Sequence, residues 1–264
     1  MPQMRIGVVL ESLNRPLRAA LNLASTLGVA GVQVDAVGPL APEALSQTGR
    51  RDFRNLLHTL SLELTALGCP LRHGFDVVDG LEARLEHVRK VLSLADDLGP
   101  RVVIVYAGAV PPEENHPVRV MLAESLTALG RHGDRVGSTL AVQAGQEPPA
   151  RLRAFLERLV PASGGLGVNV DPAALLARGH EPVAAVGELR ELIVHTHARD
   201  LRPGRPDRES QEVPLGHGDI DWTAYLGALE EVGYRGWLTI KRGGSADPAA
   251  DVKSAVAFLR RLGA

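Results

Sequence analysis

Short β-branched runs alternate with amphipathic stretches along the whole chain, and this alternation limits the fold more than any other feature. Strands that alternate with helices pair in parallel and are joined by right-handed crossovers. Eight such units in 264 residues is the number found in a (β/α)8 barrel. We therefore expect an α/β fold, a TIM barrel formed by residues 1–264 as a single domain. The expected strands are Ile6–Leu10, Gly31–Asp35, Leu62–Leu67, Val102–Tyr106, Thr139–Gln143, Leu166–Val170, Leu192–His197 and Trp237–Lys241.

The stretches between these runs show helical periodicity. One of them begins after Asp221, a good helix cap, and stops before Gly233. A doubly wound open sheet is the alternative, but no Gly-x-Gly-x-x-Gly follows the first strand, which weakens its dinucleotide-binding form. The expected helices are Pro16–Leu27, Arg50–Thr59, Leu81–Leu98, Val118–Arg131, Pro149–Leu159, Trp222–Val232 and Ala249–Leu262, and Asp200–Asp219 is the longest stretch expected to be irregular.

Charge and cysteine content restrict the partners and the compartment. A net charge of −2 gives no general field for nucleic acid or acidic lipid. Cys69 is the only cysteine, so no disulfide can form within the chain. No run approaches the ~18 apolar residues of a membrane span, and the start of the chain lacks the pattern of a secretory signal. We expect a cytoplasmic protein without nucleic-acid or membrane partners; a homo-oligomer remains open.

In such a barrel the chemistry belongs at the carboxyl ends of the strands. Lys241 is the most informative residue there, because the chain has three lysines against 26 arginines and this one lies where a strand enters a glycine-containing loop. A strand-end lysine that reaches toward water is the alternative interpretation. Gln143, the last residue of a strand, and Asp200 and Arg242, which follow strands, are candidate substrate contacts.

Two polar pairs point into the predicted barrel. His195 and His197 are two residues apart, so they face the same side of their strand, as do Asn169 and Asp171. Polar side chains on the inner face of a strand are hard to explain as core. Facing the barrel axis, the two histidines could ligate a metal or contact the hydroxyls of a sugar, and His195 is a candidate substrate contact. A buried core histidine and a capping role of Asp171 for the next helix are the alternatives.

Two segments carry a resemblance to a known family. His195-Thr-His-Ala-Arg-Asp200 and Val213-Pro-Leu-Gly-His-Gly-Asp-Ile-Asp-Trp222 resemble the seventh-strand motif and the following glycine-rich loop of the xylose isomerase-like barrel superfamily. Gly167–Pro172 and Gly233–Ile240 are similar to its sixth and last strands. The superfamily includes sugar isomerases, ketose 3-epimerases, inosose-type dehydratases and endonuclease IV.

The resemblance implies a divalent-cation site (Mn, Mg, Zn or Co) built from two glutamates, an aspartate and a histidine. The matching positions here hold Gln143, Asp171, His197 and Lys241. In the epimerases the two glutamates also transfer the proton, and both are replaced. The family set carries −3, whereas this set carries 0, and a dication repels an ammonium ~4 Å away by roughly 8 kcal/mol at an effective dielectric of ~20. We expect no metal and no other cofactor, with the Lys241 ammonium paired to Asp171.

The expected ligand is a small sugar or sugar phosphate. His73 and Tyr106 are candidate rim contacts, and the loop arginines Arg199, Arg202, Arg205 and Arg208 are candidate phosphate contacts. Two functions remain: an isomerase or epimerase with a diverged site, in which Lys241, His197 and Asp171 carry catalysis, or a carbohydrate-binding or regulatory barrel without catalysis. An abasic-site endonuclease needs a three-metal cluster and a basic face, and neither is visible.

Overall fold

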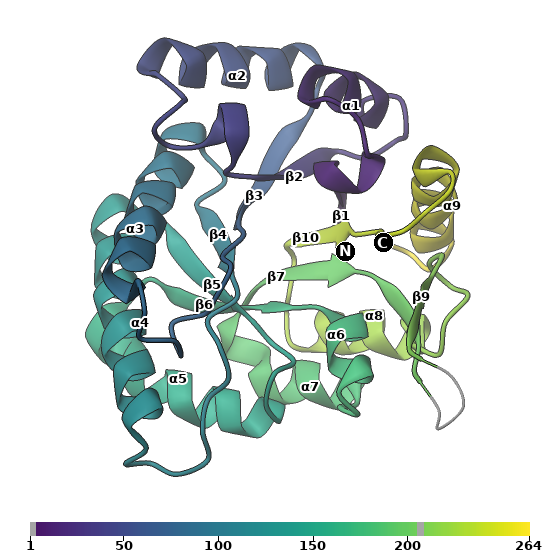
Figure 1. Ribbon diagram of the computed structural model, residues 1–264. Helices are drawn as coiled ribbons and strands as arrows, with labels where there is room; N and C mark the ends of the chain where they lie inside the picture. Colours follow the sequence, from purple (N-terminus) through teal and green to yellow (C-terminus); the bar gives the residue numbers. More distant parts are fainter. Residues whose placement is uncertain (1–3, 205–208) are drawn as a thin grey trace.

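The computed structural model describes residues 4–204 and 209–264. Eight parallel strands close into a barrel (Figure 1), in the order β1-β10-β7-β6-β5-β4-β3-β2. The prediction of a (β/α)8 barrel is thereby confirmed. The barrel strands are β1 (Arg5–Val9), β2 (Gly31–Asp35), β3 (Glu63–Cys69), β4 (Val102–Val105), β5 (Thr139–Gln143), β6 (Leu166–Val170), β7 (Ile193–Ala198) and β10 (Trp237–Ile240).

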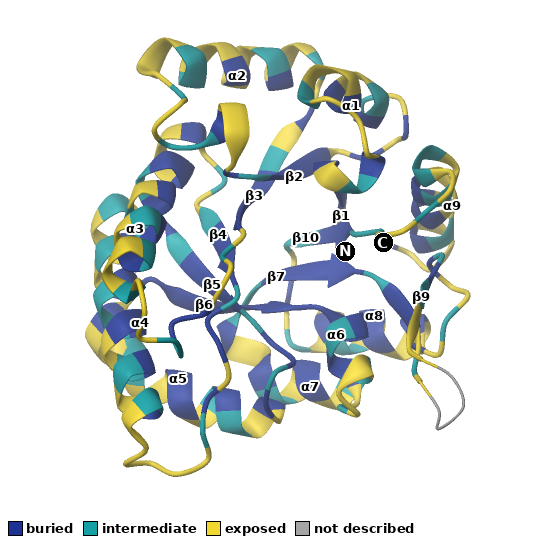
Figure 2. Ribbon diagram, in the orientation of Figure 1, coloured by how far each residue is buried: buried dark blue, intermediate teal, exposed yellow. Residues whose placement is uncertain are grey.

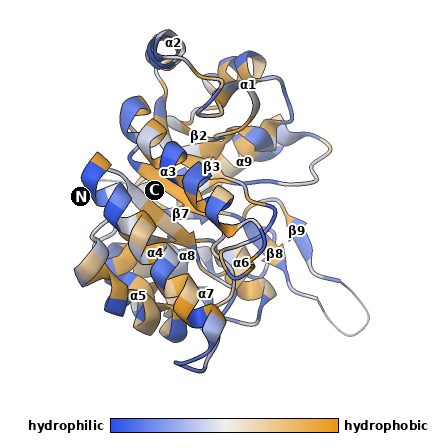
Figure 3. Cartoon of the chain, turned by 60° about the vertical axis from the view of Figure 1, so that its left-hand side comes forward, coloured by the Kyte–Doolittle hydropathy of each residue, from blue (hydrophilic) through white to orange (hydrophobic). Residues whose placement is uncertain are grey.

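Helices surround the barrel and expose their polar faces, while the strands are mostly buried (Figures 1 and 2). Apolar residues of the strands and of the inner helix faces form one large core, and the helices carry both hydrophilic and hydrophobic residues (Figure 3). The helices are α1 (Leu17–Ala24), α2 (Gln47–Thr59), α3 (Leu81–Leu98), α4 (Pro117–Val136), α5 (Pro149–Ser163), α6 (Pro172–Ala177), α7 (Pro182–Leu189), α8 (Trp222–Glu231) and α9 (Pro248–Arg261), and the short 3-10 turns are Leu10–Leu13, Gly38–Leu40 and Arg190–Leu192.

The expected boundaries differ from the observed ones mainly at the ends of elements. Helix α4 continues five residues beyond Arg131, to Val136, and α5 continues past Pro161 to Ser163. Two short helices, α6 and α7, were not expected, because each has too few turns to show a helical period. The prediction that Asp200–Asp219 is irregular was wrong in part. It contains an antiparallel pair, β8 (Asp200–Arg202) and β9 (Gln211–Val213).

The interior of the barrel is divided between apolar and polar residues. On one side, Ala66, Ile104 and Ala141 form a small apolar cluster from β3, β4 and β5. On the other side, the inward positions of β2, β6, β7 and β10 hold Gln33, Asn169, His195, His197 and Thr239, all buried. Polar groups buried at this depth require hydrogen-bond partners. The arrangement therefore concentrates polar chemistry on one half of the barrel.

Candidate functional site

Asp171 lies at the centre of the polar half, directly after β6. Its side chain has no exposed surface. Oδ1 accepts a hydrogen bond from the backbone N–H of Ala174 at 3.1 Å, which caps α6. The capping role proposed as an alternative is therefore present. Oδ2 points to the carboxyl end of the barrel, which we call the mouth, where three other side chains approach it.

Two cations share the Oδ2 atom of Asp171. Arg199 Nη1 lies 3.4 Å away and Lys241 Nζ lies 4.0 Å away. Burial on its own raises the pKa of Asp171, but the positive charges of Arg199 and Lys241 oppose the effect of burial, and the pKa lies below its usual range. Asp171 is therefore an ionised carboxylate at neutral pH and a very weak base.

Below Asp171, the two histidines belong to a continuous hydrogen-bonded chain. The Thr239 hydroxyl lies 2.9 Å from His195 Nε2, and His195 Nδ1 lies 2.8 Å from Asn169 Oδ1. The other end of Asn169 places Nδ2 3.3 Å from His197 Nδ1. His197 Nε2 then lies 2.9 Å from Gln33 Oε1 on β2.

One direction of donation satisfies every contact in this chain. Thr239 donates to His195 Nε2, His195 Nδ1–H donates to Asn169, the Asn169 amide donates to His197 Nδ1, and His197 Nε2–H donates to Gln33. Both rings are neutral in this scheme. Burial lowers the pKa of both histidines, and Lys241 lowers each further, although Asp171 partly opposes the shift at His197.

This geometry does not fit the divalent cation that the resemblance implies. His197 Nδ1, the nitrogen that faces Asp171, already accepts from Asn169, and Nε2 is held by Gln33. The remaining corner beside Asp171 holds two cations instead of carboxylates. Within residues 4–204 and 209–264, no group of three or more His, Cys, Asp or Glu side chains is arranged to hold an ion. The donor set that Mg²⁺ or Mn²⁺ requires is oxygen-rich and negative.

The other predicted contacts occupy different parts of the mouth. Gln143 ends β5 beside Asn169 in the strand register and is half-buried. Tyr106 follows β4 and is half-buried; burial raises the pKa of its hydroxyl, and the carboxylates of Asp76 and Glu147 add to the shift. His73 is exposed, and the structure shows it in no hydrogen bond with the residues described.

Asp200 and Arg242 form hydrogen bonds with other protein groups. Asp200 is buried, and its two oxygens accept hydrogen bonds from the backbone of Leu201, Gly216 and Gly218 and from the Trp222 indole, at 2.8–3.0 Å. These four hydrogen bonds give the buried carboxylate a structural role, and we no longer propose it as a substrate contact.

Arg242 is similarly engaged by protein groups. Its Nε donates to Asp251 on α9 at 2.9 Å, and its Nη1 donates to Glu212 on β9 at 3.2 Å. Glu212 also accepts from Arg199 Nε at 2.6 Å. The glutamate thus ties the β8–β9 hairpin to both arginines and orients Arg199 toward Asp171. Arg202 is exposed and donates to the His217 carbonyl, whereas Arg205 and Arg208 lie outside the described residues.

Two acidic residues at the mouth, Glu11 and Asp35, were not among the predicted site residues. Glu11 Oε1 accepts the backbone N–H of Asp35 at 2.9 Å, which joins the loop after β1 to the end of β2. Loss of hydration raises the pKa of both carboxyls, and their mutual repulsion adds to the shift at Glu11. The signal was available: Asp35 ends a predicted strand on the same face as Gln33.

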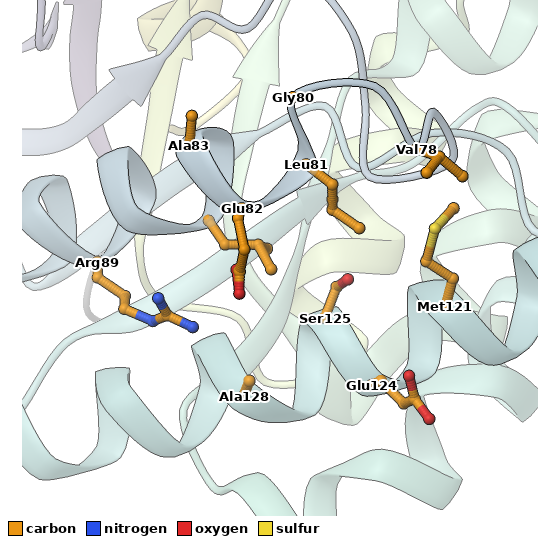
Figure 4. Close-up of a pocket in the computed structure, with 11 residues that line it drawn as sticks. Val78, Gly80, Leu81, Glu82, Ala83, Arg89, Met121, Glu124, Ser125 and Ala128 are labelled. Carbon is orange, nitrogen blue, oxygen red and sulfur yellow. The ribbon is translucent and has the colours of Figure 1, made fainter.

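A separate groove lies outside the barrel. It has a volume of about 620 Å³ and runs between the start of α3 and the middle of α4 (Figure 4). Leu81, Leu85 and Met121 make it largely apolar, and Glu82, Arg89 and Glu124 add charge at its edges. None of the predicted site residues lines it. No helix in the described part of the chain has the length and apolar character needed to cross a membrane.

Comparison with known proteins identifies the family of this chain. The family model described as xylose isomerase-like TIM barrel matches residues 21–262. Inosose dehydratase of Lacticaseibacillus casei is 25% identical, over a match that covers 58% of this chain and only 60% of that enzyme. A xylose isomerase domain protein from Planctomyces limnophilus has a TM-score of 0.87 at 27% identity, covering 99% of this chain and 98% of that one. A D-tagatose 3-epimerase-like protein has a TM-score of 0.78 at 18% identity, with 98% of both chains covered, so this likeness concerns the fold alone. The chain belongs to the xylose isomerase-like TIM barrel family.

Proposed function

We propose that the mouth of this barrel binds a sugar or a sugar phosphate without a divalent cation, and that the protein is an isomerase or epimerase whose Lys241 ammonium takes the place of the ion. The observation that carries the proposal is the position of Lys241 Nζ, 4.0 Å from Asp171 Oδ2. The resemblance to the family matches Lys241 to a residue that would bind the metal. The ammonium is one-third exposed, so it can meet a ligand from the mouth.

The chemistry of the two cations suits such a ligand. An ammonium donates up to three hydrogen bonds and stabilises negative charge on a carbonyl or hydroxyl oxygen. Arg199 keeps part of its guanidinium open to solvent, and a guanidinium binds phosphate oxygens in a fork. Asp171 and Glu212 hold both cations in place before the ligand arrives.

The family and its members support the class of ligand. The name of the Lacticaseibacillus relative specifies an inosose, which is a polyhydroxylated carbonyl compound. A site with donors at Lys241, Arg199 and Gln143 and acceptors at Asp35 and Glu11 matches the alternating hydroxyl and carbonyl groups of such molecules.

A second candidate is a carbohydrate-binding barrel without catalysis. Gln143 and Lys241 favour it, because the resemblance matches them to the two glutamates that transfer the proton in the epimerases, and neither supplies a carboxylate. Both candidates require sugar binding at the mouth, and they differ only in turnover.

Titration calorimetry in the presence of EDTA tests the shared requirement. We expect D-fructose, D-tagatose or L-ribulose, or D-fructose 6-phosphate, to bind the wild-type protein in the absence of metal. Lys241→Met should weaken binding by a factor of about 10 or more, the loss of one charge-assisted hydrogen bond. Lys253→Met is the matched control, because Lys253 is exposed on α9.

Two results would contradict the proposal. Sugar binding that appears only when Mn²⁺ is added would show that the site requires a metal ion. Equal loss of affinity in Lys241→Met and Lys253→Met would show that Lys241 does not contact the sugar. A preference for the sugar phosphate that disappears in Arg199→Ala would identify Arg199 as the phosphate contact.

A further inference from the structure

Asp35 faces the inside of the barrel at the end of β2. Gln33, two residues earlier, reaches across the barrel to His197, which fixes the inward face of this strand. Alternate residues of a strand share a face, so the Asp35 side chain points to the same interior, one step closer to the mouth.

Gly68 on the neighbouring strand makes room for the Asp35 carboxylate. The two residues are paired in the register of β2 and β3. A Cβ atom at Gly68 would collide with Oδ1 of Asp35. The carboxylate therefore lies against the backbone of β3, and the side chain of any larger residue at position 68 would occupy the same space.

The Asp35 carboxylate has no hydrogen-bond donor among the residues that the structure describes, although its own backbone N–H is held by Glu11. Asp171 presents the opposite case, with an N–H on one oxygen and two cations on the other. Lys241 acts electrostatically on both carboxylates and lowers the pKa of each. The ammonium thus has one carboxylate that is fully engaged and one that is free.

The two carboxylates also differ in basicity. Burial raises the pKa of Asp35 in spite of Lys241, whereas the pKa of Asp171 is held well below its usual range. A general base is most effective when its pKa lies close to the working pH. Asp35 is therefore much better suited than Asp171 to accept a proton from carbon.

We propose that Asp35 is the general base of this site and that Lys241 is its electrophilic partner. This inference rests on the proposed function. The Asp35 carboxylate takes the proton from the carbon next to the ligand's carbonyl group. The C–H electron pair forms a C=C bond, and the carbonyl π electrons move to oxygen, where the Lys241 ammonium stabilises the negative charge. Return of a proton to carbon restores a carbonyl compound, so no oxidant or reductant is needed.

Glu11 is a positioning residue in this scheme. Its Oε1 holds the backbone N–H of Asp35 at 2.9 Å, and an amide oxygen can accept the same hydrogen bond. Glu11→Gln should therefore keep Asp35 in place, whereas Glu11→Ala should not.

Solvent exchange measures the proposed step directly. Because Asp35 is half-buried at the open mouth, its proton exchanges with water, and a sugar incubated in D2O should acquire deuterium next to its carbonyl. We expect the wild-type protein with EDTA to label D-fructose, D-tagatose, L-ribulose or D-fructose 6-phosphate, detected by proton NMR. Asp35→Asn should slow labelling by a factor of about 100 or more while it keeps sugar affinity within a few fold. Asp52→Asn, on the exposed face of α2, is the matched control and should label at the wild-type rate.

The outcomes separate this inference from the proposed function. If Asp35→Asn labels as fast as wild type, the base is another residue and the sugar site stands. If wild type binds a sugar but labels none, the inference is wrong and the barrel is a binding protein. If wild type binds none of these sugars, the proposed function is wrong and the inference falls with it.

A second variant moves the carboxylate without removing it. Gly68→Ala displaces Asp35 from the backbone of β3, and the carboxylate, at the end of a flexible side chain, can yield without unfolding the strand. We expect labelling to fall by a factor of about 10 or more at unchanged sugar affinity. Wild-type labelling in a folded Gly68→Ala variant would show that the position of Asp35 is irrelevant and would overturn the inference.

Discussion

Lys241 Nζ lies 4.0 Å from Oδ2 of Asp171, a side chain with no exposed surface. One end of this ion pair is reached from the mouth and the other is sealed inside the barrel. The carboxylate therefore fixes the ammonium at the base of the mouth, while the ammonium keeps its free hydrogens for a ligand. A metal ion at this point would have to displace Lys241 as well as Arg199.

Neutralising Asp171 should lower the free energy of unfolding by more than the loss of a helix cap alone would. Asp171→Asn keeps an oxygen for the Ala174 N–H but leaves Lys241 and Arg199 without their shared anion. Because both cations can reach solvent, we expect a loss of about 2 kcal/mol in the free energy of unfolding, below the 3–5 kcal/mol typical of a broken, fully buried pair. Urea unfolding followed by circular dichroism measures the loss.

Asp221→Asn provides the matched control for this experiment. Asp221 caps α8 through Ala224 N–H at 3.0 Å, in the same way that Asp171 caps α6, but it is exposed. We expect a change below about 0.5 kcal/mol. If the two variants unfold at the same urea concentration, the charge of Asp171 contributes nothing beyond the cap.

The fold could be predicted because each barrel strand is a compact apolar run that the helical stretches separate. Errors arose where the periodic signal is too short, as at α6, or where tertiary contacts decide the structure, as in the β8–β9 hairpin. Glu212 illustrates the second case, since its bonds to Arg199 and Arg242 join residues that no local pattern connects.

The candidate site could be predicted only where a strand position was informative by itself. The inward placement of His195, His197 and Asp171 followed from alternation along their strands. The structural role of Asp200 could not be predicted, because no local pattern shows that Gly216, Gly218 and Trp222 donate hydrogen bonds to its carboxylate. Asp35 could have been identified from alternation along its strand, but no local pattern shows that Gly68 makes room for its carboxylate.

Restoring carboxylates should create a metal site. Gln143→Glu together with Lys241→Glu changes the four family positions from a net charge of 0 to −3. The structure adds that Arg199 still lies 3.4 Å from Asp171 Oδ2, so a third change, Arg199→Ala, should tighten Mn²⁺ binding by a further factor of about 10. Calorimetry with Mn²⁺ compares wild type and both variants. One equivalent of metal in wild-type protein purified without chelator would contradict the expectation.

Removing the Asp200 carboxylate should affect stability, not sugar binding. Asp200→Ala leaves the N–H groups of Gly216 and Gly218 and the Trp222 indole without their acceptor, and hydrogen bonds to a charged group contribute about 1.5–3 kcal/mol each. We expect a loss of more than about 3 kcal/mol. Asp219→Ala, an exposed neighbour in the same loop, should change stability by less than about 0.5 kcal/mol. Weakened sugar binding at full stability in Asp200→Ala would reverse the assignment.

The neutral histidine chain should make the protein less stable as the pH falls below about 6.5, the usual pKa of histidine in an unfolded chain. The pKa of His195 in the folded protein lies well below this value, because burial disfavours its charged form and His197 and Lys241 add to the effect. As the pH falls, the unfolded chain therefore binds a proton at this histidine and the folded protein does not. Each such histidine lowers the free energy of unfolding by up to about 1.4 kcal/mol for each pH unit of that fall. Asp35, Glu11 and Glu147 have a raised pKa in the folded protein, so their protonation at lower pH raises the free energy of unfolding. The contribution of His195 must therefore be measured as the difference between a variant and wild type. We expect His195→Gln to show a shallower decline in unfolding free energy than wild type between pH 7 and pH 5, and identical slopes would mean that His195 takes up its proton equally well in both states.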